Sequence, residues 1–340
     1  MIREDVQLVD ARKKEDDSGI RPTSLKDFIG QKKIIENLNV YIEAAKMRKE
    51  PLDHILFSGP PGLGKTTLAR ILANVQNGTF HQISAPNLKR PGDMARILTN
   101  VAENDVLFID EIHRLSAPVE EVLYSAMEDN SIDITITDGM AASSIQLKIP
   151  PFTLAAATTR AGALSAPLRD RFGIHERLEF YTTEDLQQIL KRCANIWNFN
   201  LPEAAYNMIA ERSRRTPRIA IRLLRRVWDF ILVKKSNEQD AILATIKDAF
   251  TQLGIDELGL TSLDREFLNI IAKRYSGGPV GLKPISAILS EDLITLEDFI
   301  EPYLVQIGFV KRTPRGRTLT PEAYSHLGIS HSIFGQGELF

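Results

Sequence analysis

The sequence predicts an α/β protein with a domain built on a parallel sheet, then a helical domain, then a small domain of helices with a two-stranded wing. Short apolar segments alternate with helical patterns between residues 55 and 157, which is typical of a parallel sheet covered on both faces. Helical periodicity dominates after Thr183. Near the end of the chain, two short strand patterns flank a basic turn.

The length of 340 residues suggests two or three domains. We expect a flexible, charged N-terminus at 1–20, the sheet domain at 21–182 with an insertion near 132–149, the helical domain at 183–254, the last domain at 255–329 and a tail at 330–340. No role follows from the sequence for the tail.

Composition limits the classes of function. Hydrophobic residues make up 43% and charged residues 25% of the chain, ordinary values for a globular protein. The net charge of −2 means that any DNA contact needs a local basic patch. The one cysteine, Cys193, excludes an internal disulfide. We expect a cytoplasmic protein that does not enter a membrane, because neither a signal-peptide pattern nor a run of about 20 apolar residues is present.

The elements of the sheet domain follow from their residue patterns. Apolar residues from Ile34 to Ala45 recur at helical spacing and predict a helix over 32–47. The apolar segment 55–58 ends in glycines and is typical of a buried parallel strand. The remaining expected elements are a helix over 65–73, strands over 80–83 and 106–109, a helix over 119–127 and a strand over 153–157.

A hairpin interrupts this rhythm. Residues 132–136 and 145–149 alternate between apolar and polar side chains, and Asp138-Gly139 lies between them. We expect a hairpin with a rather long tip, inserted into the sheet domain and projecting from it.

The second half of the chain is mainly helical. The pattern over 218–233 follows the i, i+3, i+4 rule closely. After a boundary near residue 254, helices are expected over 263–273, 284–289 and 295–307. Short strands on either side of Pro314-Arg315-Gly316 complete the layout of a winged helix.

A phosphate-binding motif lies between the first strand and the next helix. Residues 59–66 match G-x-x-x-x-G-K-[ST] in full. Glycines let the backbone N–H groups wrap a triphosphate, and the helix directs its positive end at the phosphates. Lys65 would neutralise phosphate charge and Thr66 would bind Mg²⁺. The alternative is a chance glycine-rich turn, which the flanking strand and helix disfavour.

Two carboxylates follow the strand at 106–109. Asp110 lies where open α/β sheets bind ligands and can hold Mg²⁺. Glu111 is the candidate that polarises an attacking water. Alone, such a pair is most often solvated, so this interpretation depends on the phosphate loop upstream.

Further candidates are less specific. The strand 153–157 ends in hydroxyls that would lie beside Glu111, although a threonine there could instead cap a turn. Arg169 and Arg171 could supply a cation to a γ-phosphate, but a surface salt bridge is the better interpretation from the residues alone. Arg218 begins the strongest helix, after Thr216-Pro217.

The basic turn predicts DNA binding. No acidic residue occurs between Pro302 and Pro321, whereas Lys311, Arg312, Arg315 and Arg317 do. Guanidinium groups suit phosphate oxygens, so we expect contacts independent of base sequence. The alternative is a solvated basic turn.

Taken in order, these motifs resemble an AAA+ ATPase, and along nearly the whole chain they resemble the RuvB family of Holliday junction branch migration motors. The blocks that carry the likeness are 21–22 with 27–31, 59–67, 110–115, 150–152, 157–162, 168–173, 216–220 and 312–317.

The resemblance implies a role for each matching residue. Catalysis would use Lys65, Asp110, Glu111, Thr159 as sensor 1 (Thr158 being the less favoured choice), Arg171 as the finger (with Arg169 as the alternative) and Arg218 as sensor 2. ATP would contact Arg21, Gly62, Gly64, Lys65, Thr66, Thr67, Glu128, Asp129, Asn130, Arg171, Tyr181 and Arg218. Mg²⁺ would be held by Thr66 and Asp110, and DNA by Arg312, Arg315 and Arg317.

The resemblance also implies partners. It suggests a homo-hexamer that pulls the arms of a Holliday junction in recombination and repair, with RuvA docked on the hairpin and RuvC in the resolving complex. A clamp-loader-like or protein-remodelling ATPase would share every nucleotide motif, but would lack the hairpin and the wing. A third alternative is a DNA-binding regulator whose ATPase serves only as a switch. Such a protein could do without Glu111 or an arginine finger, so the complete set of hydrolytic residues argues against it.

Overall fold

The computed structural model describes residues 19–138, 141–235 and 238–329. The expected flexible N-terminus and tail therefore lie largely outside the described residues. The chain divides into two compact units, with the boundary between Tyr181 and Thr182. Within the described residues, no helix is both long and apolar enough to cross a membrane.

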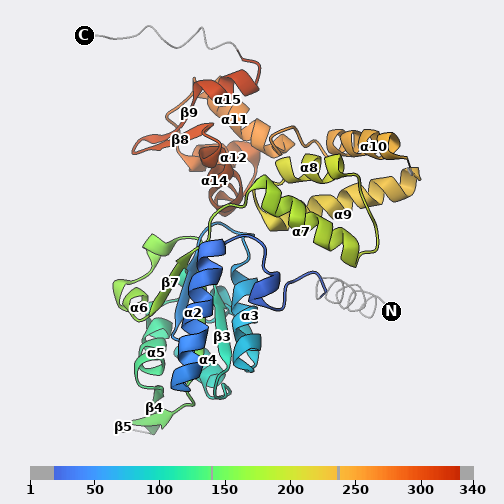
Figure 1. Cartoon of the computed structure of the whole chain (residues 1–340). Coiled ribbons are helices and arrows are strands. Elements are labelled where there is room, and N and C mark those ends of the chain that lie inside the picture. Colours follow the sequence, from blue (N-terminus) through green and yellow to red (C-terminus); the bar gives the residue numbers. More distant parts are fainter. Residues whose placement is uncertain (1–18, 139–140, 236–237, 330–340) are drawn as a thin grey trace, which may run out of the picture. The chain divides into compact units, whose positions relative to one another are not determined.

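The first unit is built on a five-stranded sheet in the order β2-β3-β6-β1-β7 (Figure 1). All neighbouring strands are parallel. Their bounds are β1 (Ile55–Ser58), β2 (Phe80–Ser84), β3 (Val106–Asp110), β6 (Thr153–Thr158) and β7 (Ile174–Arg177). The carboxyl ends of the three central strands, β3, β6 and β1, therefore meet at one edge, as parallel pairing requires.

Helices cover the sheet because alternate strand residues point to opposite faces. Leu56, Leu107 and Leu154 pack with α4 (Pro91–Leu98) and α5 (Ala117–Glu128) in one buried cluster. Phe57 and Phe108 are fully buried and alternate with these leucines along their strands. The other helices of this unit are α2 (Lys32–Arg48), α3 (Lys65–Gln76) and α6 (Ala166–Asp170), with a short η1 (Leu25–Asp27) before them.

The insertion is an antiparallel hairpin of β4 (Ser131–Asp138) and β5 (Ala141–Lys148), which projects from the sheet unit (Figure 1). The long tip expected from the sequence is wrong, because pairing continues to Asp138 opposite Ala141. Only residues 139 and 140, which lie outside the described part, separate the strands. Alanines are weak strand formers, so the sequence underestimated the length of β5.

The second unit begins with four helices: α7 (Thr183–Ile196), α8 (Glu203–Glu211), α9 (Pro217–Lys234) and α10 (Gln239–Gln252). The predicted helix over 218–233 corresponds to α9, whose apolar face buries Leu223, Leu224 and Val227. Lys235 ends α9 in a left-handed conformation, at φ 52°.

The rest of this unit has α11 (Ser262–Arg274), α12 (Leu282–Leu289), α14 (Glu301–Gln306), β8 (Val310–Thr313), β9 (Gly316–Leu319) and α15 (Pro321–His326). The single helix expected over 295–307 is wrong in detail. It consists of α13 (Leu293–Thr295), a π-helical turn η5 (Leu296–Ile300) and then α14. Pro302 follows the π-helical turn and lacks the N–H that a regular helix would use.

His54 ties the beginning of β1 to two neighbouring elements. Its Nδ1 accepts a hydrogen bond from the Leu154 N–H (2.9 Å), and its Nε2 lies 3.2 Å from the Met127 carbonyl oxygen. The backbone N–H donor fixes the neutral tautomer, with the proton on Nε2. Burial lowers the pKa of His54 below its ordinary value of 6.5 and outweighs the attraction of Asp53.

This histidine predicts acid sensitivity. Because its pKa is lower in the folded state, the stability that neutral His54 contributes is complete above about pH 6.5 and is lost as pH falls below it. We expect the urea midpoint to fall between pH 7.5 and 5.5, and to fall less in His54→Gln, as followed by circular dichroism. The exposed His175 provides the control, His175→Gln. An equal pH response in His54→Gln and the wild type would contradict this role.

Candidate functional site

The phosphate loop follows β1 and requires two of its glycines. Gly59 has φ +133°, and a Cβ there would lie 2.7 Å from the Leu178 carbonyl oxygen. Gly64 has φ +107°, and its Cβ would lie 2.9 Å from the Phe28 ring. The loop thus keeps a backbone cradle that side chains would fill. Phe28 was missed as a site residue by the motif analysis, although it lies in a block that carries the family likeness.

Lys65 begins α3 and is buried, at 8% exposure. Its ammonium donates hydrogen bonds to the carbonyl oxygens of Gly59 (2.7 Å) and Pro60 (2.8 Å). Burial lowers the pKa of Lys65 to about 8, while Asp110 and Glu111 act to raise it. The two carboxylates therefore lie close enough to act electrostatically on the loop.

Asp110 is the last residue of β3 and Glu111 follows it, at the end of the strand where the sequence predicted both carboxylates. Asp110 accepts a hydrogen bond from the Glu111 N–H at 3.0 Å. Glu111 has φ +53°, which is unusual for a residue with a side chain. Its carboxylate lies 3.0 Å from the Arg114 Nε.

Thr158, the last residue of β6, and Thr159, which follows it, differ in their contacts. The Thr158 hydroxyl lies 2.9 Å from His113 Nδ1 and accepts a hydrogen bond from the Arg160 N–H. The Thr159 hydroxyl is buried and has no hydrogen-bond partner among the described residues. A buried hydroxyl without a partner is costly, so it fits a site that a bound group completes. His113 was missed by sequence reasoning, although it lies two residues after Glu111.

Several predicted nucleotide residues surround the loop. Thr66 and Thr67 lie in the first turn of α3. The buried Tyr181 donates a hydrogen bond to the Leu63 carbonyl oxygen at 3.0 Å. Arg21 is close enough to Arg70 on α3 to help lower its pKa, after the larger effect of burial. The segment before α2 therefore lies along the helix that carries the phosphate loop.

Arg171 is held within its own chain. Its guanidinium donates to the Pro167 carbonyl oxygen (2.7 Å), pairs with Glu128 (3.1 Å) and lies 4.3 Å from the centre of the Tyr124 ring. The side chain is 22% exposed. Arg169 is 48% exposed and 3.7 Å from Asp170.

Arg171 and the segment 128–130 lie at the amino ends of the sheet strands, opposite the edge that carries the phosphate loop. Arg171 precedes β7, and the first residue of β7, Ile174, pairs with the first residue of β1, Ile55. The loop follows the last residue of β1. Glu128, Asp129 and Asn130 come directly after Met127, whose carbonyl oxygen contacts His54 before β1. These residues are therefore not brought to the phosphate loop of their own chain.

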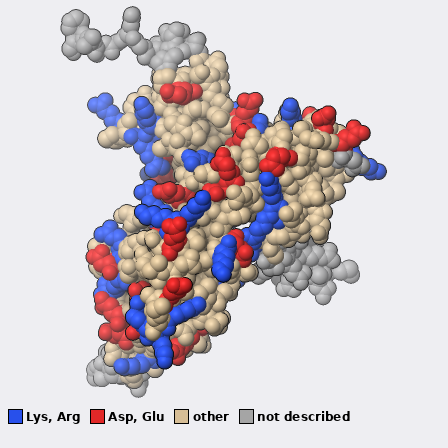
Figure 2. Space-filling model, in the orientation of Figure 1, with Lys and Arg blue, Asp and Glu red and all other residues tan. Residues whose placement is uncertain are grey.

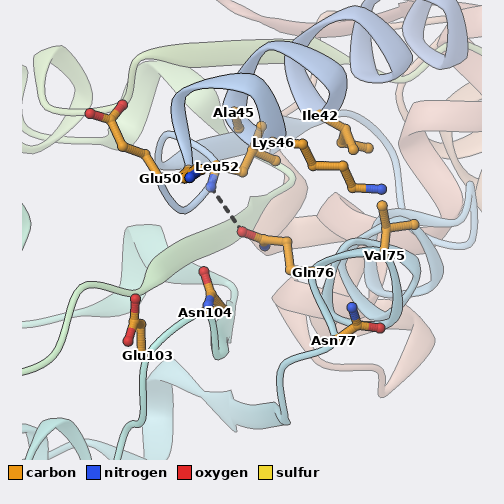
Figure 3. A pocket seen from close by; sticks show the side chains of 11 residues that line it. Ile42, Ala45, Lys46, Glu50, Leu52, Val75, Gln76, Asn77, Glu103 and Asn104 are labelled. Carbon is orange, nitrogen blue, oxygen red and sulfur yellow. Dashed lines mark hydrogen bonds between the residues drawn. The ribbon is translucent and has the colours of Figure 1, made fainter.

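A cavity of about 330 Å³ lies at the far end of α3 (Figure 3). Its lining includes Glu50, Gln76 and Glu103, and the Gln76 side chain accepts a hydrogen bond from the Leu52 N–H at 2.8 Å. Gln76 ends the helix that Lys65 begins, so about 18 Å of helix separates this cavity from the phosphate loop. It is not part of the nucleotide site.

The wing arginines are less free than the sequence predicted. Arg312 and Arg317 face each other across β8 and β9. Both donate to Glu301, which is fully buried: Arg312 at 2.9 Å, and Arg317 at 2.6 and 3.1 Å. The sequence analysis considered the stretch from Pro302 to Pro321, which has no acidic residue, and so missed Glu301 directly before it. Arg312 stays 55% exposed and Arg317 23%, and Arg315 is exposed at the turn.

On the face shown in Figure 2, Lys and Arg side chains gather around the β8–β9 hairpin. The rest of that face carries both basic and acidic side chains. Arg218 is exposed in the first turn of α9, in the second unit. Its predicted action on the nucleotide remains a prediction.

The fold and this site define a nucleotide-binding P-loop domain with a helical lid, the arrangement of an AAA+ ATPase. The model of the Holliday junction DNA helicase RuvB P-loop domain matches residues 20–178. Those of the RuvB AAA lid domain and the RuvB C-terminal winged helix domain match residues 181–256 and 257–328. The chain belongs to the RuvB family, and the predicted fold class is confirmed.

Solved structures agree with this assignment. The chain is 49% identical to Thermotoga maritima RuvB, described as a Holliday junction branch migration motor, with a TM-score of 0.83 over 92% of this chain and 99% of that one. A proline-to-glycine variant of that protein gives 50% identity and a TM-score of 0.83, covering 91% and 99%. The Aeropyrum pernix ORC2 protein, at 15% identity and a TM-score of 0.51 over 83% and 87%, shares the fold alone.

The lowered pKa of Lys65 predicts proton uptake on nucleotide binding. A polyphosphate beside Lys65 favours the charged ammonium, so ADP binding should take up about 0.9 proton at pH 9 but about 0.1 at pH 7, given a free pKa of about 8. Calorimetric titration in buffers of different ionisation enthalpy measures this uptake. Lys65→Arg, whose guanidinium stays charged, should show none. Equal uptake by both proteins at pH 9 would refute the assignment.

Proposed function

We propose that this protein is an ATP-driven motor that moves Holliday junction DNA as a hexameric ring, acting in homologous recombination and DNA repair with RuvA and RuvC in the cytoplasm. The observation that carries the proposal is that the phosphate loop follows the carboxyl end of β1, whereas Arg171 precedes the amino end of the neighbouring parallel strand β7. Membership of the RuvB family supports the choice of DNA substrate.

One half of the site belongs to the phosphate loop. Lys65 exchanges its two loop carbonyl acceptors for the β- and γ-phosphates, and Glu111 accepts a hydrogen bond from the attacking water. The unpartnered hydroxyl of Thr159 donates to the γ-phosphate. Thr66 and Asp110 would hold Mg²⁺, which neutralises phosphate charge when bound. Gly62, Gly64 and Thr67 complete the cradle.

The other half must come from a neighbouring subunit. The four residues of β1 span about 13 Å between the edge that carries the phosphate loop and the edge that carries Arg171. A guanidinium at the second edge cannot reach a nucleotide at the first, but it can serve one bound to the next chain. We assign Arg171 as the arginine finger that acts on the ATP of the neighbouring subunit. Glu128, Asp129 and Asn130 contact that same nucleotide.

The domains divide the work along the chain. We assign ATP binding to residues 21–182, with Arg21 and Tyr181 beside the nucleotide, the lid to 183–254 and DNA binding to 255–329. Arg218 on the lid acts as sensor 2. The hairpin β4–β5 projects from the ATPase domain and docks on RuvA.

DNA is held by the wing through phosphate contacts. Glu301 uses one guanidinium nitrogen of Arg312 and two of Arg317, so each arginine keeps donors for phosphate oxygens. Arg315 adds a third cation at the exposed turn. Contacts of this kind carry no base information, which suits a motor that must pass over any sequence.

Glu111 gives the first test of the motor. With linear duplex DNA present, Glu111→Gln should hydrolyse ATP about 100-fold more slowly or worse, because it loses the group that activates water, yet bind ADP normally. The exposed Glu121 of α5 provides the control, Glu121→Gln. Wild-type hydrolysis should rise with DNA and lose that stimulation as salt increases. No stimulation with or without RuvA would favour a protein-remodelling function.

Arg171 gives the second test. Arg171→Ala and Lys65→Ala rings should each be inactive when pure, whereas mixed rings should hydrolyse ATP. An intact phosphate loop in an Arg171→Ala subunit can then face an intact Arg171 on its Lys65→Ala neighbour. ATP hydrolysis is measured across a series of mixing ratios. Absence of rescue at every ratio would exclude action in trans, and Arg169→Ala tests the alternative finger in the same way.

A further inference from the structure

The connection between the lid and the winged helix is tightly hydrogen-bonded. Residues 253–261 join α10 to α11, and side chains hold their backbone. Arg265 on α11 donates to the carbonyl oxygens of Gly254 (2.9 Å) and Leu260 (2.8 Å). Asp256 accepts from the N–H groups of Leu258 (3.0 Å) and Leu260 (2.8 Å). A free tether would leave these groups to water.

One lid side chain reaches three parts of the neighbouring domain. Arg214 lies between α8 and α9, and its side chain is 11% exposed. Its Nε donates to the Gly259 carbonyl oxygen at 2.8 Å, and its Nη2 forms an ion pair with Asp264 on α11. Its guanidinium also lies 5.1 Å from the centre of the Tyr303 ring on α14. Arg214 therefore touches the connection, the first helix and a later helix of the winged helix.

The partner of Arg214 is a buried charge. The Asp264 side chain is 1% exposed. It also accepts hydrogen bonds from the N–H (2.7 Å) and the hydroxyl (2.5 Å) of Thr261, the residue that caps the beginning of α11. A carboxylate buried this deeply needs its cation, because removing one partner leaves an uncompensated charge. The pair is thus a fixed attachment, unlike the exposed ion pairs elsewhere on the lid.

The backbone at this junction has two unusual residues and one close approach. Arg214 and Arg215 are consecutive residues with positive φ, at +49° and +56°, a conformation that costs energy unless surrounding contacts hold it. A Cβ on Gly259 would lie 2.3 Å from the Arg212 carbonyl oxygen. The lid loop and the connection therefore approach as closely as glycine allows.

Tyr303 reinforces the same contact. Its hydroxyl donates a hydrogen bond to the Leu258 carbonyl oxygen at 2.5 Å. Burial raises the pKa of Tyr303 to about 12, so the hydroxyl stays protonated as a donor. The ring beneath Arg214 is thus itself fastened to the connection.

We propose that Arg214 is a positioning residue that fixes the winged helix to the lid, so that both move as one body when the nucleotide acts on Arg218. Arg218 lies four residues further along, in the first turn of α9. This inference rests on the proposed function. It identifies where motion produced at the ATP site passes to the DNA-binding domain.

The first experiment measures the attachment directly. Spin labels at Val233→Cys in α9 and Ile294→Cys in α13 use exposed positions, at 83% and 50%. Cys193 is buried and burial raises its pKa to about 11, so it does not compete for the label at pH 7. Pulsed dipolar spectroscopy should give one narrow distance distribution without nucleotide, with ADP and with a non-hydrolysed ATP analogue.

Arg214→Met keeps most of the side chain's length but removes the charge, and should broaden that distribution. The control is Arg226→Met, because Arg226 pairs with Asp229 at 3.1 Å within α9 and is half exposed. Its distribution should stay narrow. A distribution in Arg214→Met as narrow as that of the control would overturn the proposal.

The second experiment separates positioning from simple stability. Arg214→Met should slow branch migration about tenfold, a typical coupling between sites, while DNA-free ATP hydrolysis and DNA affinity stay within about twofold. Adding Asp264→Asn removes the unpaired buried charge, so the double variant should regain thermal stability but not branch migration.

Recovery of both properties in the double variant, or unchanged branch migration in Arg214→Met, would refute the positioning role. The failure of the proposed function has a different signature. In that case the wild type itself would lack DNA-stimulated ATP hydrolysis and branch migration, whereas the distance measurements would still report on the attachment.

Discussion

The parallel pairing of β1 with β6 on one side and β7 on the other is the constraint on which the rest of the structure depends. It places the phosphate loop beside Thr158 and Thr159, because Gly59 continues the same ladder by donating its N–H to the Thr158 carbonyl oxygen at 3.1 Å. It also fixes Arg171 at the opposite edge. One set of backbone hydrogen bonds thus decides which chemical groups a nucleotide can meet within a single chain.

Buried carboxylates give the last domain its internal order. Glu301 and Asp264 are 0% and 1% exposed, and each is neutralised by arginine. Buried ion pairs contribute little net stability compared with apolar packing, but they penalise any arrangement that separates the partners. Glu301, with its two arginines, fixes the wing on its helices, and the pair of Asp264 with Arg214 fixes those helices to the lid. Geometry, more than stability, is what these charges determine.

The sequence predicted most of the fold because the relevant signals are local. A phosphate loop between an apolar strand and a helix, or the periodicity of α9, is contained in fewer than twenty residues. Strand β7 was not predicted, since four residues with exposed His175 and Arg177 resemble a loop. The π-helical turn before Glu301 was not predicted because tertiary packing, not propensity, sets it.

The candidate site was harder to predict where it depends on distant residues. The motifs named Asp110, Glu111 and Lys65, and the resemblance favoured Thr159 over Thr158, but no local pattern reveals the contact of Thr158 with His113. Likewise the arginines of the wing were visible, whereas the carboxylate that holds Arg312 and Arg317 lies eleven and sixteen residues away. Such partners share no local pattern, so only the folded chain identifies them.

The placement of the phosphate loop and Arg171 near opposite ends of the paired strands β1 and β7 also has a genetic consequence. On the proposed ring mechanism, each copy completes one ATP site with its loop and a different site with its arginine. A subunit substituted at Lys65 therefore disables one site, and its Arg171 still completes another. Two defective alleles, one altered at Lys65 and the other at Arg171, would then complement each other in a cell that carries both, although neither alone gives active rings.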